Sequence, residues 1–242
     1  VLVEAASIPA VEAALRVLRA QDWAHVGIWE WDMVSNRLFF SPECARLYGR
    51  SAEALGELAA WQACLHPDDR PRIEQLLAER AVSGAPVELE FRILLPDGGI
   101  RWLVSKGSVY RDAQQRPVRL LGIHLDITQS KLAEQQLRQL SLALEQSPDG
   151  VFITDTRARI EYVNPAFLAA SGYQQHEVIG RTPSLLRSGL TPDASYVALW
   201  DAINHGQRWH GEFINQRKDG SHYQVLATVS PIRQESGEIT HY

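Results

Sequence analysis

The sequence predicts an α+β fold built from two copies of one unit, each a five-stranded antiparallel sheet with helices on one face, joined by an amphipathic helix. The first observation is an internal repeat: Gly27–Asp32 matches Gly150–Asp155, and the same offset places Pro42 on Pro165. The second observation is the order of elements within each copy, which is two short strands, a helical middle and a β meander. Strands and helices that are segregated in this way favour an antiparallel sheet covered on one side.

The first copy shows this order clearly. Strands are predicted at residues 26–32, 37–40, 87–95, 100–111 and 118–127. Ser41-Pro42 is expected to start a helix, because serine caps helix N-termini and proline fits the first helical turn. A longer helix is expected over residues 68–83, with Asp68 as its capping residue. Asp97-Gly98 is a typical hairpin turn between the third and fourth strands.

The second copy repeats the pattern. Strands are predicted at residues 151–155, 159–163, 209–217 and 222–233, and a last strand begins at Ile239 and is truncated at Tyr242. Asn164-Pro165 takes the place of Ser41-Pro42 as the helix start. A longer helix is expected over residues 193–205, after Pro192.

Two amphipathic helices are predicted outside the sheets. In the linker, Ala133, Leu137, Leu140 and Leu144 follow the 4-3-4 spacing of a heptad seam. The predicted organisation is therefore an N-terminal helix (1–22), a first domain (23–128), a linker helix (129–146) and a second domain (147–242). Each apolar helix face packs either on its own domain or on a partner helix. We expect a homodimer through the linker helix, the N-terminal helix with Val11, Leu15 and Leu18 on one face, or both.

Composition argues against several functions. The 242 residues carry 24 Lys and Arg against 29 Asp and Glu, with no basic run, so nucleic acid is not an expected partner. No apolar segment reaches the ~20 residues that a membrane span requires. Cys44 and Cys64 are expected as reduced core residues. No nucleophile arrangement, phosphate-binding loop or metal-ligand cluster is recognisable, so we expect neither an enzyme nor a metal site in this chain.

Several short motifs resemble those of tandem PAS domains, over nearly the whole chain. They include Trp29-Glu30-Trp31-Asp32, His66-Pro67-Asp68-Asp69-Arg70 and Asp126-Ile127-Thr128 in the first copy, and Tyr162-Val163-Asn164-Pro165 and Lys218-Asp219-Gly220 in the second. The resemblance implies the sensory input module of a bacterial signalling protein, such as a two-component system. Such a module relays its signal through flanking helices to an output domain outside this chain, often a histidine kinase or a cyclic-di-GMP enzyme. We expect a cytoplasmic location, with or without a membrane anchor in the parent protein.

The strand over residues 209–217 resembles that of FAD-binding redox PAS domains of the NifL and Aer type. Residues 209, 211, 213 and 215 share one face of a strand. Trp209 and Phe213 offer apolar area, Gly211 leaves room for a ring, and Asn215 offers the donor and the acceptor that a flavin pyrimidine edge needs. The resemblance adds Asn164 and Trp200 as further cofactor-binding candidates in this possible FAD site.

Other interpretations of the second copy stay open. In a ligand-free dimerisation and relay module, Trp209 and Phe213 would be core residues and Asn215 would start a turn. Light-sensing LOV domains carry a reactive cysteine where Pro183 stands here, so any flavin is expected to act as a redox cofactor. His205 and His210 are expected as surface or helix-end residues rather than haem ligands.

Overall fold

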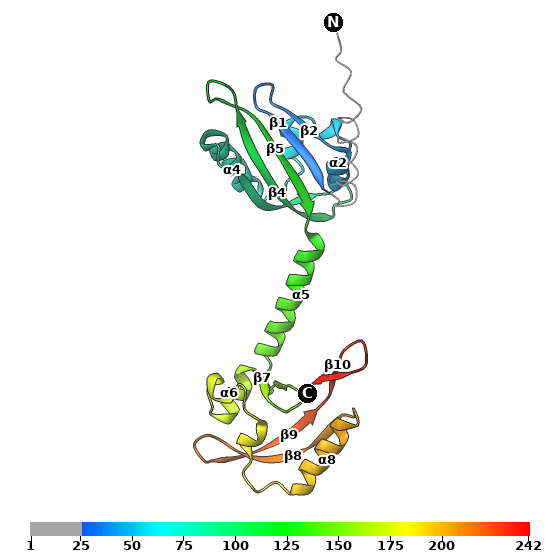
Figure 1. Ribbon diagram of the computed structural model, residues 1–242, viewed down its shortest axis with the longest axis vertical. Helices are drawn as coiled ribbons and strands as arrows, with labels where there is room; N and C mark the ends of the chain where they lie inside the picture. Colours follow the sequence, from blue (N-terminus) through cyan, green and yellow to red (C-terminus); the bar gives the residue numbers. More distant parts are fainter. Residues whose placement is uncertain (1–25) are drawn as a thin grey trace. The chain divides into compact units, whose positions relative to one another are not determined.

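The computed structural model describes residues 26–242, which form two compact units (Figure 1). The units divide between Gln135 and Gln136, inside helix α5 (Thr128–Glu145). This helix is the predicted linker, and it starts one residue before the predicted boundary. The predicted N-terminal helix, with Val11, Leu15 and Leu18, lies outside the described residues.

The first unit contains the predicted five-stranded antiparallel sheet, with the strand order β2-β1-β5-β4-β3. Its strands are β1 (Gly27–Asp32), β2 (Arg37–Phe40), β3 (Val87–Leu94), β4 (Ile100–Arg111) and β5 (Pro117–Asp126). The last strand of the unit, β5, is central: Leu120 lies opposite Trp31 of β1 on one side and opposite Val109 of β4 on the other. Leu120 has no exposed surface, so the centre of the sheet lies within the core.

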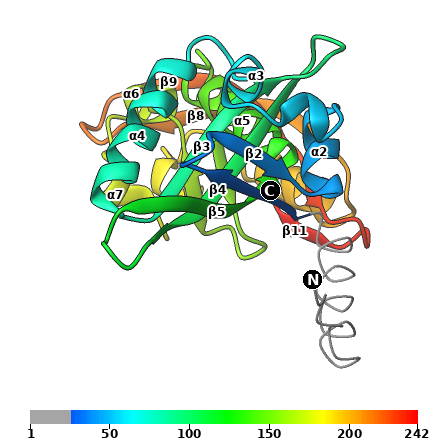
Figure 2. The same cartoon turned by 90° about the horizontal axis from the view of Figure 1, so that it is seen from above.

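Four helical segments cover one face of this sheet, as α2, α3 and α4 show in Figure 2. They are α2 (Pro42–Tyr48), the 3₁₀ helix η1 (Glu53–Leu55), α3 (Leu58–Gln62) and α4 (Arg70–Ser83). The prediction that Asp68 caps α4 is wrong: Asp69 holds the N-cap position, and its side chain makes no capping bond. The Asp69 carboxylate instead accepts hydrogen bonds from Arg92 N (2.8 Å) and Arg92 Nε (3.0 Å).

The core of the first unit is rich in aromatic side chains. It includes Trp29, Phe40, Tyr48, Trp61 and Phe91, together with the free cysteines Cys44 and Cys64. Both cysteines are buried, as the sequence predicted. At Gly27 the sheet and α2 come so close that a Cβ atom would lie 2.6 Å from Cys44 Cα, so this position requires glycine.

The second unit reproduces the topology but not a continuous five-stranded ladder. Its strands are β6 (Phe152–Thr154), β7 (Ile160–Val163), β8 (Trp209–Gln216), β9 (His222–Val229), β10 (Ile232–Arg233) and β11 (Ile239–His241). They pair as three two-stranded sheets, and an Asp155–His241 bridge links β6 to β11. The counterpart of the central strand β5 is β11, which has three residues before the sequence ends at Tyr242. The ladder that β5 completes in the first unit is therefore interrupted here.

The helical middle of the second unit consists of α6 (Pro165–Ser171), α7 (Gln175–Val178), the 3₁₀ helix η2 (Pro183–Leu186) and α8 (Asp193–Asn204). A compact core forms where α6 and α7 meet β7, around Ile160, Phe167 and Val178. Within residues 26–242, no helix has both the length and the apolar composition needed to cross a bilayer.

One capping arrangement recurs at the same place in both units. Ser41 Oγ accepts hydrogen bonds from Cys44 N in α2 (3.2 Å) and from Ile28 N in β1 (3.0 Å). At the matching position, Asn164 Oδ1 accepts from Phe167 N in α6 (3.0 Å) and from Val151 N (2.8 Å). One side-chain oxygen therefore caps a helix and holds the start of the first strand against it.

Asn164 also uses its amide group as a donor. Its Nδ2 donates to Leu144 O (3.0 Å) and Asp149 O (2.9 Å), and the side chain has no exposed surface. All of these bonds are made to the protein's own backbone. The structure therefore gives Asn164 a structural role, and its contact with a cofactor stays a prediction.

Asn164→Ala is expected to lower the free energy of unfolding by about 2–4 kcal/mol, because four backbone groups lose the hydrogen bonds that this buried side chain makes. Asn164→Ser keeps an acceptor of the kind found at Ser41 and is expected to recover about half of this loss. Urea unfolding monitored by circular dichroism measures both variants. An unchanged midpoint for Asn164→Ala would contradict the structural role.

Candidate functional site

The predicted flavin strand is β8, and its four predicted residues share one face. Trp209, Gly211, Phe213 and Asn215 are partly buried and alternate with exposed residues along the strand. In the ladder with β9 they lie opposite Val229, Ala227, Val225 and Tyr223, respectively. The prediction that these residues line one surface is therefore confirmed.

A row of stacked side chains covers part of this surface. The Phe213 ring lies 4.9 Å from the Trp209 ring and 5.3 Å from the ring of Tyr196, which α8 provides. The Arg187 guanidinium lies 4.0 Å from the centre of the Tyr196 ring. The sequence analysis missed Tyr196 and Arg187. Tyr196 precedes Trp200 by one helical turn, and this spacing could have placed both side chains on one face of α8.

The space above Gly211 contains the indole of Trp209. A Cβ atom at Gly211 would overlap two carbons of the six-membered ring of this indole. The missing side chain therefore allows a planar aromatic ring to lie against β8, as predicted, and in this structure that ring belongs to the protein itself.

Asn215 lies at the end of the row, on the edge of the sheet. Its backbone forms a bridge with Arg187. Asn215 lies opposite Tyr223 in the β8–β9 ladder, and its side chain counteracts the rise that burial causes in the pKa of that tyrosine. Next to it, Thr191 Oγ1 accepts a hydrogen bond from Ile214 N at 2.9 Å. The loop before α8 thus closes the edge of β8 beside Asn215.

The other residues considered in the sequence lie away from this row. Trp200 of α8 is 40% exposed, and its ring meets the ring of Tyr242 edge-on at 6.3 Å. His205 and His210 are exposed; His205 contacts Asp201 O, and His210 contacts Thr228 Oγ1. Their prediction as surface residues is confirmed. Residues 26–242 contain no cluster of three or more His, Cys, Asp or Glu that could hold a metal ion.

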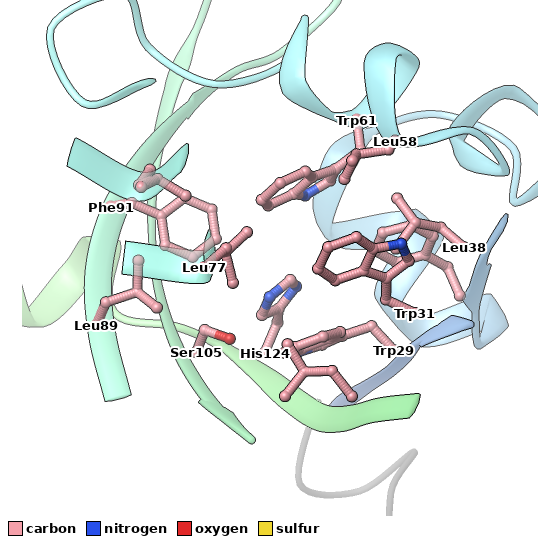
Figure 3. A pocket seen from close by; sticks show the side chains of 13 residues that line it. Trp29, Trp31, Leu38, Leu58, Trp61, Leu77, Leu89, Phe91, Ser105 and His124 are labelled. Atoms are coloured by element: carbon pink, nitrogen blue, oxygen red, sulfur yellow. The ribbon is translucent and has the colours of Figure 1, made fainter. Parts of the chain in front are cut away.

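The first unit has a cavity of its own between the sheet and the helices (Figure 3). Its walls are apolar and aromatic apart from Ser105 and His124. The lining includes Trp29, Trp31, Leu58, Trp61, Ile73, Leu77 and Phe91. The centre of a water molecule can occupy a volume of about 20 Å³ in this cavity. The cavity is therefore large enough for one water molecule.

His124 is the central polar group of this cavity. Tyr48 Oη accepts a hydrogen bond from Trp61 Nε1 at 2.9 Å and forms a second hydrogen bond with His124 Nδ1 at 3.1 Å. Burial lowers the pKa of His124 to about 3. The sequence analysis missed His124, although its inward position on the last strand was a usable signal.

The Asp126-Ile127-Thr128 motif forms the junction between β5 and α5. Asp126 pairs with Arg101 at 3.1 Å and accepts a hydrogen bond from Thr128 N at 2.8 Å. Thr128 Oγ1 in turn accepts from Trp102 N at 3.0 Å. The first residue of α5 is therefore fixed to β4 of the first unit.

Two α+β units with the same order of elements, joined by a connecting helix, are typical of the tandem sensory domains of signalling proteins. Family models described as the PAS fold match residues 37–124 and residues 138–242. The chain belongs to the PAS family and carries two PAS domains in tandem. These domains are sensory rather than catalytic.

Proteins with regulatory names are among its relatives. A nitrogen fixation regulatory protein of Klebsiella oxytoca is 38% identical over 99 residues, which is 41% of this chain and 20% of that protein. The aerotaxis receptor of Escherichia coli is 34% identical over 89 residues, 37% of this chain and 17% of the receptor. A probable diguanylate cyclase of Escherichia coli is 29% identical over 169 residues, 68% of this chain and 15% of the cyclase. The chain thus spans a small part of the length of each relative.

The stability of the first unit is expected to fall in mild acid because of His124. Below pH ~6.5 an unfolded histidine binds a proton, whereas the folded imidazole stays neutral down to about pH 3. The unfolded chain then binds more protons, so the free energy of unfolding decreases by about 2 kcal/mol between pH 7 and pH 5. Urea unfolding at the two pH values measures this change.

His124→Gln is expected to remove this part of the pH dependence, whatever it does to stability at pH 7. His176→Gln, at an exposed position in the second unit, is the control and should leave the difference between pH 7 and pH 5 unchanged. If His124→Gln and wild type lose the same free energy between the two pH values, the buried neutral histidine is not the cause.

Proposed function

We propose that the second unit binds FAD on the inner face of β8. The chain would then sense redox state and relay it through α5 to an output domain. The observation that carries the proposal is the row of aromatic rings on β8, which combines the flat floor at Gly211 with the amide of Asn215. The strand motif resembles that of FAD-binding PAS domains, and the relatives include a nitrogen fixation regulatory protein and an aerotaxis receptor.

The residues present fit a flavin ring. The surface at Gly211 has room for a planar aromatic system, which here is the Trp209 indole, so a flavin ring would take the place of this indole. Asn215 carries a donor and an acceptor on one side chain, and both would pair with the pyrimidine edge. Phe213 and Tyr196 supply apolar packing, and Trp200 of α8 remains a candidate contact. Bound FAD would supply the electron-accepting chemistry that a redox sensor needs.

A ligand-free dimerisation and relay module is the second candidate function. The position of the Trp209 indole favours it, because the ring fills the space above Gly211. The Asn215 side chain likewise has a polar neighbour without a ligand, because Tyr223 lies opposite it in the ladder. In this case the stacked row is simply the core between α8 and β8.

Asn215→Ala is expected to weaken FAD binding by up to about a hundredfold, because two polar atoms of the ring edge lose their partners, at ~1–3 kcal/mol. Titration of the reconstituted chain with FAD, followed by flavin fluorescence, measures the dissociation constant. Gln224→Ala is the matched control, since this amide lies on the exposed face of the same ladder and should leave binding unchanged.

The possible results separate the two candidates. Wild type that neither copurifies with flavin nor takes it up would rule out the redox sensor in favour of the ligand-free module. If Asn215→Ala binds FAD as tightly as wild type, flavin binds but the proposed contact with Asn215 is wrong.

We further propose that the relay works in a homodimer through α5, with the N-terminal helix as a possible second contact. None of the described residues of α5 is buried, and Leu137 and Leu140 are 69% and 65% exposed. Burying a leucine contributes ~1.5–3 kcal/mol, so a seam of several leucines favours association. The output partner would be a histidine kinase or a cyclic-di-GMP enzyme in the parent chain, and the location cytoplasmic.

Leu137→Glu/Leu140→Glu is expected to convert the dimer to a monomer, because four charges would face one another across the seam of two helices. Light scattering coupled to size exclusion measures the mass. Gln135→Glu/Gln139→Glu adds the same charge away from the seam and should remain dimeric. A monomeric wild type at high concentration would overturn the proposed dimer.

A further inference from the structure

We infer that a stack of charged and aromatic side chains couples helix α4 to the first turn of α5. The inference rests on the proposed relay through α5 and names the residues of the first unit that would carry it. At its centre is Trp102 of β4. Arg92 Cζ lies 5.5 Å and Lys131 Nζ lies 5.6 Å from the centre of its ring, both within the range of a cation–π contact.

The backbone of Trp102 holds the entrance to α5. Its N–H donates to Thr128 Oγ1 (3.0 Å), and its carbonyl accepts from Ile127 N (3.0 Å). Its side chain contacts Lys131, one turn further along the helix. The same residue thus fixes both the end of β5 and the first turn of α5.

Lys131 is held from a second side as well. Its Nζ pairs with Glu90 of β3 at 2.7 Å and with Glu134 of α5 at 3.5 Å. The Lys131 side chain is only 28% exposed, so these contacts are partly shielded from water and lose less to screening than a fully solvated pair.

On the other side of the stack, Arg92 connects Trp102 to α4. The Arg92 guanidinium forms a two-point pair with Asp69, with bonds of 2.7 and 3.0 Å, and Asp69 also accepts the backbone N–H of Arg92. Asp69 is 8% exposed and directly precedes α4. A planar guanidinium that is hydrogen-bonded at two points has little rotational freedom. Its position therefore depends on the position of Asp69.

Helix α4 also borders the cavity of the first unit. Ile73 and Leu77 line the cavity wall, one and two turns beyond Asp69. From the first turn of the same helix, Arg72 donates to Glu90 O at 2.7 Å. A displacement of α4 by a change in the cavity therefore reaches α5 by two connected routes, through Arg92 and Trp102 and through Glu90 and Lys131.

Hydrogen exchange of the full chain without added flavin tests this coupling. Lys131→Met is expected to increase amide exchange at residues 131–135 about fivefold, because it removes the direct contact. Asp69→Asn is expected to increase exchange there about threefold, although none of its hydrogen bonds or ion pairs within residues 26–242 reaches α5. This effect at a distance is the signature of the coupling.

Glu88→Gln is the matched control. It removes a 2.6 Å ion pair with Lys106 on the same two strands, away from Trp102, and should leave residues 131–135 unchanged. If Asp69→Asn exchanges like wild type at residues 131–135 while Lys131→Met is faster, the clamp on α5 is local and the coupling to α4 is refuted.

If Asp69→Asn increases amide exchange throughout the first unit, Arg92→Lys tests the coupling instead. This variant keeps the charge but loses the planar fork between Asp69 and Trp102. Faster exchange at residues 131–135 without faster exchange in β5 supports the coupling, and wild-type exchange there overturns it. The exchange rates of variants and wild type can be compared even if the chain binds no flavin or forms no dimer. Failure of the proposed function is therefore distinguishable from failure of the coupling.

Discussion

The bonds at the capping residues Ser41 and Asn164 set the spacing between sheet and helix in each unit. In both cases one oxygen accepts an N–H of the helix and an N–H at the start of the first strand. The close approach at Gly27, and at its counterpart Gly150, depends on this arrangement, because the helix backbone lies directly over the glycine. The position of this first helix in turn determines how much of the sheet surface the other helices enclose.

The two units use the same cap to different extents. Ser41 Oγ accepts from two backbone N–H groups, whereas Asn164 also donates to Leu144 O near the end of α5. At the opposite end, Thr128 is bonded to Trp102 in the first unit. A side-chain hydrogen bond therefore connects each end of α5 to the unit in which that end lies. Such connections suit a helix that transmits a conformational change.

Local patterns made most of the fold predictable. The strand alternation of β3 and β8, the proline-initiated helices and the repeat itself depend on neighbouring residues and were found from the sequence. The Asp68 prediction failed because capping competes with a long-range pair, and Arg92 lies 23 residues from Asp69. The contacts of Tyr196 with Phe213 and of His124 with Tyr48 likewise join distant segments, so no local spacing predicts them.

The site in the second unit shows the same division. The alternation of side chains along a β-strand predicts one shared face for Trp209, Gly211, Phe213 and Asn215, and the structure confirms this placement. That the Trp209 indole turns back over Gly211 is a matter of side-chain torsion and packing, which strand periodicity does not encode. The family resemblance makes Asn164 a cofactor-binding candidate, whereas its four backbone partners become apparent only in the folded chain.

The strand at one border of each sheet is covered by the chain itself. In the first unit Leu65 bridges Ile93 of β3, and in the second unit Arg187 bridges Asn215 of β8. Free strand borders expose unpaired backbone groups that recruit other chains into mixed sheets and aggregates. Each bridge occupies one position of an eight-residue strand, so at that position β3 or β8 is not available to pair with a strand of another copy. The association between copies can then change while the strand pairing inside each sensory unit stays intact.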